Sequence, residues 1–585
     1  MNHLARQTKI RLGVFLSCLG FVLLGSAFIP YVGIQTDEAL VGDPIFGSIA
    51  SEFRIRIFHH DVPLMLMDYV GALKSWLYWP IFGIFRPSPQ SLRWPVLILG
   101  AVTIWLFYLL LIRIAGARAA LAGCLLLATD TMFLLTTEFD WGPVAIQHLM
   151  LVTACLLLLR FAQTGSTKCL FGGFLALGLG IWDKALFTWM VGGLAVAVLA
   201  VFPKETFRRL NLKNLGVALA GLLLGAAPLL IFNARHHWPT IWQHASFSTE
   251  NIAQKADVLN STLDGSGLFG YMVAEPEHHN LLLPALLLSL VAVPLWGKSR
   301  RAILFALVFM AATWIQMALT ANAGGSVHHA VLLWPFPQFV IALALAEASR
   351  HWLAAFIALV SILCAANLLL TGQYLASLIR EGPMVTFTDA IYPLSDSLAN
   401  ETRDVIVMDW DIYDPLLLLR RGGNLRAGFF EIMKGPTDPK IASLLNDAAV
   451  FVTHTPDNQF FPAVNQKLES AAAARGYRKD ILRYVNDTHG RRIFEVYRFA
   501  KEQGTGQKDP KENSSGPYQS LSEGEVVQKL APFRSGYPSS FNRRAASVGT
   551  SAGAALVRAG SVLLLLLGDY SGDENSPWPA NSVMA

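Results

Sequence analysis

The chain has 585 residues, of which 53% are hydrophobic and only 15% are charged. Ordinary soluble domains have about 25% charged residues, so this composition excludes a soluble globular protein and indicates an integral membrane protein. The net charge of +5 does not indicate a nucleic-acid partner, because the location of the charges matters more than their sum. We therefore expect the lipid bilayer as a partner and no nucleic acid.

The first hydrophobic segment, residues 10–32, is long enough to cross a bilayer, which needs about 20 apolar residues. Three basic residues lie at its start: Arg6, Lys9 and Arg11. The positive-inside rule therefore places the N-terminus in the cytoplasm. A cleaved signal peptide is the alternative, but the segment exceeds the about 7–15 apolar residues of a signal sequence. Asp37 and Glu38 follow the segment and are predicted to emerge on the outer side.

Ten further spans bring the predicted number to eleven. They cover approximately residues 94–112, 119–137, 143–160, 170–182, 185–202, 214–234, 281–296, 302–320, 330–347 and 351–371. When the spans alternate from a cytoplasmic N-terminus, every strongly basic connecting loop falls on the cytoplasmic side, as the positive-inside rule requires. Most carboxylates of the connecting loops fall on the outer side. We predict a multi-pass membrane protein with this topology.

The first outer loop is long and contains an aromatic stretch, residues 69–85, with Lys74 among its rings. Such a stretch suits a helix that lies along the membrane interface, where amphipathic rings sit at headgroup level. A membrane-spanning helix is the alternative. We reject it because one extra span would invert the topology of everything downstream.

Hydropathy falls sharply after residue 371, and a small extracytoplasmic α/β domain is predicted at 383–499. Strands are predicted at 404–409 and 449–453, a helix at 462–475, and a hairpin from 480–486 and 491–498. From 501 to 585, Lys, Glu, Gly, Ser and Pro are abundant, which predicts a disordered tail. The expected fold is thus an α-helical polytopic membrane domain, residues 1–372, followed by this α/β domain and the tail.

Candidate catalytic groups are the carboxylates on the outer side: Asp37, Glu38 and Asp140. A carboxylate partly withdrawn from water can accept the proton of an attacking hydroxyl. The alternative is that they are solvated loop acids, as most exposed Asp and Glu residues are. A fourth carboxylate, Asp130, lies inside a predicted span, where an acid is a functional candidate by default. The flanking threonines could satisfy it locally, so we expect a structural role.

Cations on the outer side run against the positive-inside trend and are candidates for binding a lipid phosphate. They are Lys184, Arg93, Arg235 and Lys74. For each of them, snorkelling to the interface is the alternative. His328 and His329 precede the segment 330–337 and could hydrogen-bond a phosphate or a sugar. Adjacent histidines do not share a helix face, so a divalent metal cation would have to be held by separate loops.

The order of several short motifs resembles a known family. They are the Asp37–Glu38 pair, YVGALK at 69–74, SLRWP at 91–95, DWGP at 140–143 and HHAVLLWP at 328–335. Together they resemble the C-type glycosyltransferase superfamily, specifically the bacterial relatives of protein O-mannosyltransferases and lipid A aminoarabinose transferase, glycosyltransferase family 39. The resemblance covers about residues 10–370, and an outer C-terminal domain is also common in such enzymes.

The resemblance implies transfer of a sugar, with inversion, from a polyprenyl-phosphate donor to a lipid, glycan or protein acceptor on the outer face of the bacterial cytoplasmic (inner) membrane. Asp37 would be the general base, and Glu38 and Asp140 would orient the acceptor. Lys184, Arg93 and His328 or His329 would stabilise the departing lipid phosphate. The chain departs from the O-mannosyltransferases in lacking a sugar-binding insert, which puts a protein acceptor in doubt.

Two other functions remain as alternatives. A transporter or flippase of lipid-linked glycans would need charged residues along the middle of several helices and internal repeats. Only Asp130 meets the first requirement, and no repeat is evident. A non-catalytic assembly factor would act through the C-terminal domain, and its activity would not depend on Asp37.

Overall fold

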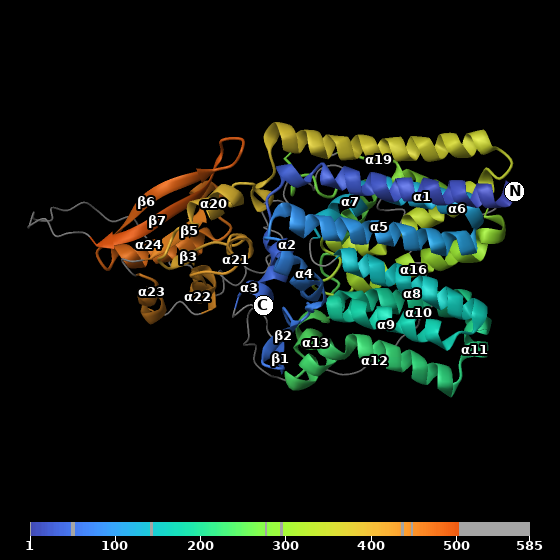
Figure 1. Cartoon of the computed structure of the whole chain (residues 1–585), viewed down its shortest axis with the longest axis horizontal. Helices are drawn as coiled ribbons and strands as arrows, with labels where there is room; N and C mark the ends of the chain where they lie inside the picture. Colours follow the sequence, from blue (N-terminus) through green and yellow to red (C-terminus); the bar gives the residue numbers. More distant parts are fainter. Residues whose placement is uncertain are drawn as a thin grey trace, which may run out of the picture.

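The computed structural model describes residues 2–47, 53–140, 144–274, 278–292, 296–434, 438–445 and 449–501. A bundle of long helices forms one part, and a sheet flanked by short helices lies at one end of it (Figure 1). The N-terminus lies at the opposite end of the bundle. Apart from Lys501, the tail predicted to be disordered lies outside the described residues.

Most of the bundle consists of long helices. Its helices include α1 (Asn2–Ser26), α5 (Pro89–Ile114), α6 (Gly116–Thr129), α7 (Thr131–Glu138), α8 (Val144–Thr164), α9 (Thr167–Asp183), α10 (Thr188–Val201), α12 (Leu212–Arg235), α16 (Arg300–Ala318), α18 (Phe336–Ala348) and α19 (Leu353–Glu381). Two further helices, α11 (Pro203–Arg209) and α15 (Leu282–Val291), lie between them in the chain.

Within the described ranges, seven helices are long and apolar enough to cross a membrane, or up to nine if each of two bent pairs is one span. The chain is therefore a multi-pass membrane protein, as its composition indicates. The predicted count of eleven is not confirmed. The predicted spans 170–182 and 281–296 correspond to α9 and α15, and neither reaches the length of about 20 residues that a bilayer needs.

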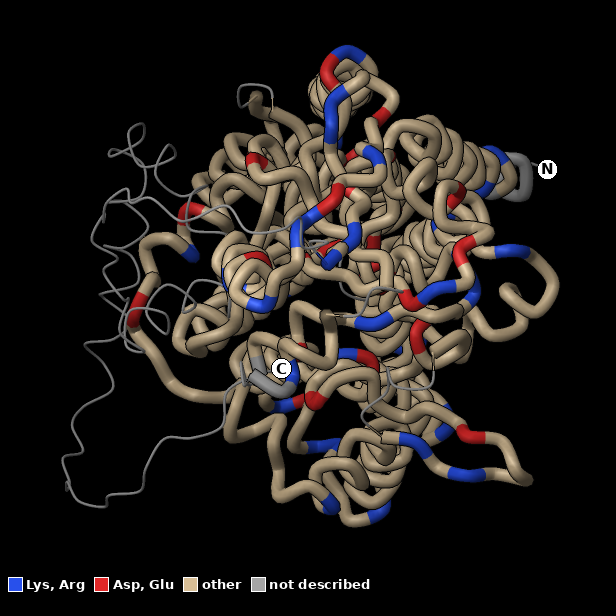
Figure 2. The backbone as a smooth tube through the Cα atoms, turned by 90° about the vertical axis from the view of Figure 1, so that its left-hand side faces the viewer, with Lys and Arg blue, Asp and Glu red and all other residues tan. Residues whose placement is uncertain are grey.

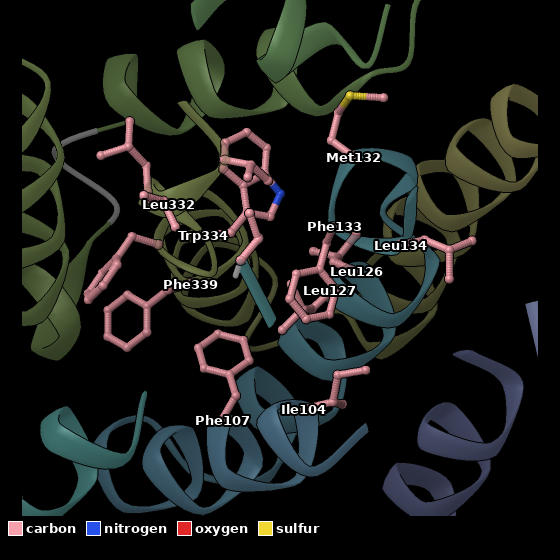
Figure 3. Packing of buried hydrophobic residues seen from close by; sticks show 14 of the residues in the cluster. Ile104, Phe107, Leu126, Leu127, Met132, Phe133, Leu134, Leu332, Trp334 and Phe339 are labelled. Carbon is pink, nitrogen blue, oxygen red and sulfur yellow. The ribbon is translucent and has the colours of Figure 1, made fainter. Parts of the chain in front are cut away.

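The core of the bundle surrounds α18. In the span Val327–Ala348, which contains α18, 83% of the most apolar stretch is buried inside the protein. In α19 the buried share of the corresponding stretch is only 22%, so α18 is central and α19 is peripheral. The apolar side chains around it interdigitate (Figure 3). They include Phe107 of α5, Leu127 of α6, Phe133 of α7, and Trp334 and Phe339. Aromatic side chains bury the largest areas, so they contribute most to this packing.

A bend of 57° between α6 and α7 interrupts one predicted span at Asp130. The Asp130 carboxylate accepts from the backbone N–H of Phe133 at 2.8 Å and from Gln338 of α18 at 2.9 Å. The first bond caps α7, and the second ties the bend to the central helix. Asp130 thus has the structural role that we expected. Its partners are a backbone amide and a distant glutamine rather than the flanking threonines.

The segment between α1 and α5 contains one long helix and several short elements. They are α2 (Thr36–Ala39), α3 (Asp43–Phe46), β1 (Phe53–Ile57), β2 (His60–Met65) and α4 (Leu73–Ile84). The helix α4 falls within the aromatic stretch 69–85, where a helix was predicted. The antiparallel hairpin of β1 and β2 was not predicted.

The C-terminal part is a five-stranded sheet of order β4-β3-β5-β7-β6. Its strands are β3 (Val405–Val407), β4 (Leu425–Ala427), β5 (Val450–His454), β6 (Tyr477–Asn486) and β7 (Arg492–Lys501). Its helices are α20 (Ile391–Ser397), α21 (Tyr413–Arg420), α22 (Gly428–Lys434), α23 (Asp438–Leu444) and α24 (Pro462–Ala473). β3 is parallel to β4 and β5, and β7 is antiparallel to β5 and β6. Each predicted strand and the predicted helix correspond to an observed element.

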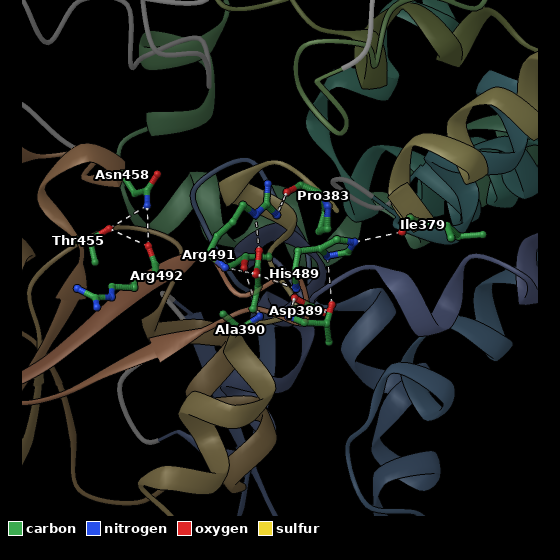
Figure 4. A network of polar contacts seen from close by, with 12 residues as sticks. Ile379, Pro383, Asp389, Ala390, Thr455, Asn458, His489, Arg491 and Arg492 are labelled. Carbon is green, nitrogen blue, oxygen red and sulfur yellow. Dashed lines mark hydrogen bonds and ion pairs between the residues drawn. The ribbon is translucent and has the colours of Figure 1, made fainter. Parts of the chain in front are cut away.

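The sheet is fixed to the bundle at the turn between β6 and β7 (Figure 4). Arg491 donates to the backbone oxygen of Pro383 at 2.7 Å, and it also pairs with Asp487 at 2.5 Å. A ring nitrogen of His489 lies 3.2 Å from the backbone oxygen of Ile379, near the end of α19. Seen from the sheet end, basic and acidic residues are interspersed over this part of the molecule (Figure 2).

A second junction joins α21 to the short helices that follow α1. The side chains of Asp43, on α3, and Asp414, on α21, are hydrogen-bonded to each other. Two carboxyl groups can share a hydrogen bond only when one of them is protonated. Burial raises the pKa of Asp43 well above its ordinary value, and Asp414 adds to the effect. Burial, with the charge of Asp37 nearby, raises the pKa of Asp414 to about 6.

This pair predicts that stability decreases as pH rises. A carboxyl group with a higher pKa in the folded protein contributes stability below its unfolded pKa of about 3.9, and this contribution is lost as pH rises through its folded pKa. For Asp414 the loss is centred near pH 6. Asp414→Asn should therefore unfold at a higher temperature than wild type at pH 8, and the difference should shrink towards pH 5. Thermal unfolding in detergent across this range measures the effect.

The matched control is Asp396→Asn, which changes an exposed carboxylate on α20. Its unfolding temperature should follow that of wild type at every pH. A pH dependence in Asp414→Asn as steep as in wild type would contradict a proton shared at this junction.

Candidate active site

Asp37 lies on α2, a single helical turn at the end of the bundle that faces the sheet (Figure 1). The Gln35 side chain caps this turn by accepting from the Asp37 backbone N–H at 2.8 Å. The Asp37 side chain itself is half-buried and interacts electrostatically with Lys184. The backbone of the turn is thus held by hydrogen bonds, while the Asp37 carboxylate remains partly accessible.

Lys74 and Asp140 form a buried ion pair, with 2.6 Å between Nζ and Oδ2. Lys74 lies in the first turn of α4, and Asp140 lies between α7 and α8. The other oxygen of Asp140 accepts from the backbone N–H of Ala145 at 2.8 Å, at the start of α8. This bond fixes the carboxylate of Asp140, the first residue of the DWGP motif. Residues 141–143 of that motif lie outside the described residues.

Lys184 lies directly after α9 and is buried. It interacts electrostatically with Asp37, Asp183 and Asp140. Burial lowers the pKa of Lys184, and the three carboxylates oppose that change. The first loop packs directly on this corner, because the Gly71 N–H donates to the Asp183 backbone oxygen at 3.0 Å. A Cβ at position 71 would lie 2.0 Å from the Trp182 backbone oxygen, so this approach requires glycine.

His328 and His329 reach the same group of charges from α17 (Val327–Ala330). Their rings are in contact, with 4.2 Å between centroids, and both interact electrostatically with Lys184. The structure therefore brings together Asp37, Lys74, Asp140, Lys184 and the two histidines from five segments of the chain. We call these six residues, with Asp183, the charged cluster.

Glu38 and Arg93 lie beside the charged cluster but pair with each other. Arg93 Nε and Nη2 donate to the two Glu38 oxygens at 2.8 and 3.0 Å. Three further bonds reach backbone oxygens of the segment after α1: Ile29, Val32 and Gly33. A guanidinium has five N–H donors, and all five are used here. Both side chains are almost fully buried.

Comparison with known proteins shows what part of the sequence and which fold this chain shares with them. The sequence model described as dolichyl-phosphate-mannose-protein mannosyltransferase matches residues 71–232. The crystal structure of ArnT from Cupriavidus metallidurans, bound to undecaprenyl phosphate, has a TM-score of 0.54 at 14% identity, over 84% of this chain and 98% of that one. Residues 71–232 therefore match the sequence model of a C-type glycosyltransferase family, and the chain as a whole shares the fold of ArnT. This confirms the resemblance to family 39 seen in the sequence.

Two further structures are less similar to this chain. The oligosaccharyltransferase of Archaeoglobus fulgidus has a TM-score of 0.46 at 14% identity, over 85% of this chain and 75% of that one. The arabinofuranosyltransferase AftD from Mycobacteria has a TM-score of 0.41 at 14% identity, over 83% of this chain and 41% of that one. No curated protein sequence matches the chain.

Two predicted phosphate-binding residues, Arg93 and Arg235, have other partners in the structure. Arg93 has no N–H left for a phosphate because Glu38 and three backbone oxygens occupy its donors. Arg235 is exposed at the end of α12, with its guanidinium 5.5 Å from the centre of the Phe53 ring. Glu38 is the ion-pair partner of Arg93.

Sequence reasoning missed Asp183, which is fully buried and adds a third carboxylate beside Lys74 and Lys184. Its place directly before Lys184 was the available signal. A metal site was also considered from the sequence. Within the described ranges, no three His, Cys, Asp or Glu side chains are grouped so as to hold a metal ion. We therefore derive no step through a metal.

Proposed function

We propose that this protein is a membrane glycosyltransferase that moves a sugar from a polyprenyl-phosphate donor to an acceptor hydroxyl. The reaction takes place on the outer face of the bacterial cytoplasmic membrane, where the C-terminal domain also lies. The match of residues 71–232 to the mannosyltransferase family model supports the reaction class. The observation that carries the proposal is the charged cluster, in which a half-buried carboxylate, Asp37, lies near the buried cation Lys184.

In the proposed reaction, Asp37 accepts the proton of the acceptor hydroxyl as its oxygen bonds to the anomeric carbon. The bond between that carbon and the phosphate oxygen breaks, and its electron pair leaves with the polyprenyl phosphate. Attack opposite the leaving group inverts the anomeric carbon. Lys184 and Lys74 stabilise the negative charge that develops on the phosphate, and a buried cation does so more strongly than one in water.

The acceptor can be a lipid, a glycan or a protein hydroxyl in this proposal. ArnT, whose fold this chain shares, was crystallised with undecaprenyl phosphate, which is a carrier of the class proposed here. The pair of Lys74 and Asp140 gives Lys74 a protein partner in the absence of substrate. A phosphate that enters the site would compete with Asp140 for the ammonium group.

The test is a sugar-transfer assay with the purified full-length protein in liposomes. The probes are synthetic polyprenyl-phosphate sugars with lipid, glycan and peptide acceptors, and the readout is the release of free polyprenyl phosphate together with labelled product. Acceptor-dependent release supports the proposal. Translocation of intact donor lipid without release would favour a flippase and overturn it.

Lys184→Gln tests the role of the cation in the same assay. A hydrogen bond to a charged group is worth about 1.5–3 kcal/mol, so the KM for the donor should rise about 10- to 100-fold. The donor KM of the wild-type protein should also rise when Lys184 loses its proton. Because burial lowers the pKa of Lys184, this rise should occur at a pH below the ordinary lysine pKa of about 10.4. The variant should lose this pH dependence.

Lys168→Gln is the matched control, because Lys168 is exposed near the other end of the same helix, α9. It should keep the wild-type KM and the wild-type pH profile. An unchanged donor KM in Lys184→Gln would remove Lys184 from the phosphate site.

A further inference from the structure

A side chain of the C-terminal domain reaches the turn that carries Asp37. Asp411 lies between β3 and α21, and its Oδ1 accepts from the Thr36 backbone N–H at 2.6 Å. The two residues are 375 positions apart, and both are buried. Thr36 is the first residue of α2, and Asp37 is the second.

The hydrogen bonds at the start of α2 explain why this contact matters. A helix begins with N–H groups that have no partner inside the helix. In α2, Gln35 accepts from the second of these groups, that of Asp37, and Asp411 accepts from the first, that of Thr36. A single turn of four residues has little stability of its own, so these two acceptors determine its orientation.

Apolar packing holds the two parts together around this hydrogen bond. Leu418 of α21 is fully buried with Ile34, Ala39 and Val41, which flank or belong to α2. The Leu418 side chain reaches so close to Gly42 that a Cβ there would lie 2.4 Å from it. The C-terminal domain therefore has a defined place against α2, and Asp411 does not reach it by a chance surface contact.

We propose that Asp411 is a positioning residue for Asp37, so that the C-terminal domain completes the active site of the transferase. The role rests on the proposed function of Asp37 as the base. Asp411 acts through the Thr36 N–H and does not touch the substrate. Its removal lets the turn rotate, and a shift of about 1 Å in a reacting group can cost about a hundredfold in rate.

The charge of Asp411 is not what this role requires. Burial raises the pKa of Asp411 well above its ordinary value, and the nearby Asp37 and Asp414 add to this effect. A neutral side chain of the same shape can therefore replace it. Asparagine keeps an oxygen that accepts from the Thr36 N–H, whereas alanine keeps none.

The experiment compares Asp411→Ala with Asp411→Asn in the full-length protein in liposomes, with kcat and both KM values measured per folded molecule. Asp411→Ala should lower kcat at least tenfold and leave the donor KM within about twofold, because positioning affects the base and not phosphate binding. Asp411→Asn should keep kcat within about threefold of wild type. An equal loss in both variants, or none in Asp411→Ala, would overturn the proposal.

A second pair of variants changes the other partner of the bond. Thr36→Pro removes the N–H donor. Proline is tolerated here because Thr36 is the first residue of α2 and because Gln35 before it has an extended backbone. Thr36→Val removes only the hydroxyl. Thr36→Pro should lose kcat as Asp411→Ala does, the two losses should not add, and Thr36→Val should retain kcat. Additive losses, or an equal loss in Thr36→Val, would overturn the proposal.

The two levels of inference can fail separately. No release of polyprenyl phosphate by the wild-type protein would overturn the proposed function and this role together. Release by wild type with unchanged kcat in Asp411→Ala would overturn the role of Asp411 alone. A lower yield of Asp411→Ala with normal kcat in its folded fraction would assign Asp411 to stability and also overturn positioning.

Discussion

Asp37→Asn is expected to lower the rate of sugar transfer at least a hundredfold. Asparagine has nearly the same shape but cannot accept the proton of the acceptor hydroxyl. General acid–base catalysis typically contributes about 10²- to 10⁴-fold, which sets the size of the loss. The turn itself should remain in place, because Gln35 binds the backbone N–H of residue 37 whichever side chain it carries. The loss should therefore be in kcat, with the donor KM close to that of wild type.

The control for this variant is Asp61→Asn, which changes an exposed carboxylate on β2 in the same loop. Its transfer rate should equal that of wild type. Both proteins are measured in liposomes at the same donor and acceptor concentrations, and their folding is compared by thermal unfolding. Equal transfer by Asp37→Asn and wild type would reject Asp37 as the base and favour a non-catalytic role for the chain.

Local sequence patterns predicted much of this fold because hydrophobic periodicity is itself local. The alternating and continuous apolar runs in the C-terminal part located β3, β5, β6 and β7. Hydropathy also located the long helices. It could not locate the bend at Asp130, because composition does not specify the direction of a helix. At this bend Asp130 accepts a hydrogen bond from Gln338, which lies 208 residues away.

The candidate site was only partly predictable, because its ion pairs are long-range. Asp37 and Glu38 are neighbours in sequence, which suggested a shared role. Neighbours in a helix point about 100° apart, so one carboxylate can face the charged cluster while the other faces Arg93. No local pattern indicates that Glu38 would form an ion pair with Arg93, which lies 55 residues further along the chain. For the same reason, nothing in the first loop indicates that Asp411 holds Thr36.

Glu38→Gln is expected to destabilise the protein by about 3–5 kcal/mol, because it leaves the Arg93 charge buried without a partner. Arg93→Met should cost more, since it strands the Glu38 carboxylate and also removes the donor of three backbone oxygens. The double variant Glu38→Leu with Arg93→Met buries no charge, and apolar replacement of both partners of an ion pair can be nearly neutral. It should therefore be more stable than Arg93→Met alone. Thermal and denaturant unfolding in detergent measure this order.

Recovery in the double variant should be incomplete, because Arg93 also donates to the backbone oxygens of Ile29, Val32 and Gly33. Buried acceptors left without a donor cost about 1–3 kcal/mol each. The donor KM separates this structural role from the phosphate-binding role predicted from the sequence. If Arg93 holds only the segment after α1, the folded double variant should bind the donor as wild type does. A donor KM raised at least tenfold in both Arg93→Met and the double variant would instead mean that Arg93 leaves Glu38 to bind the phosphate when substrate enters.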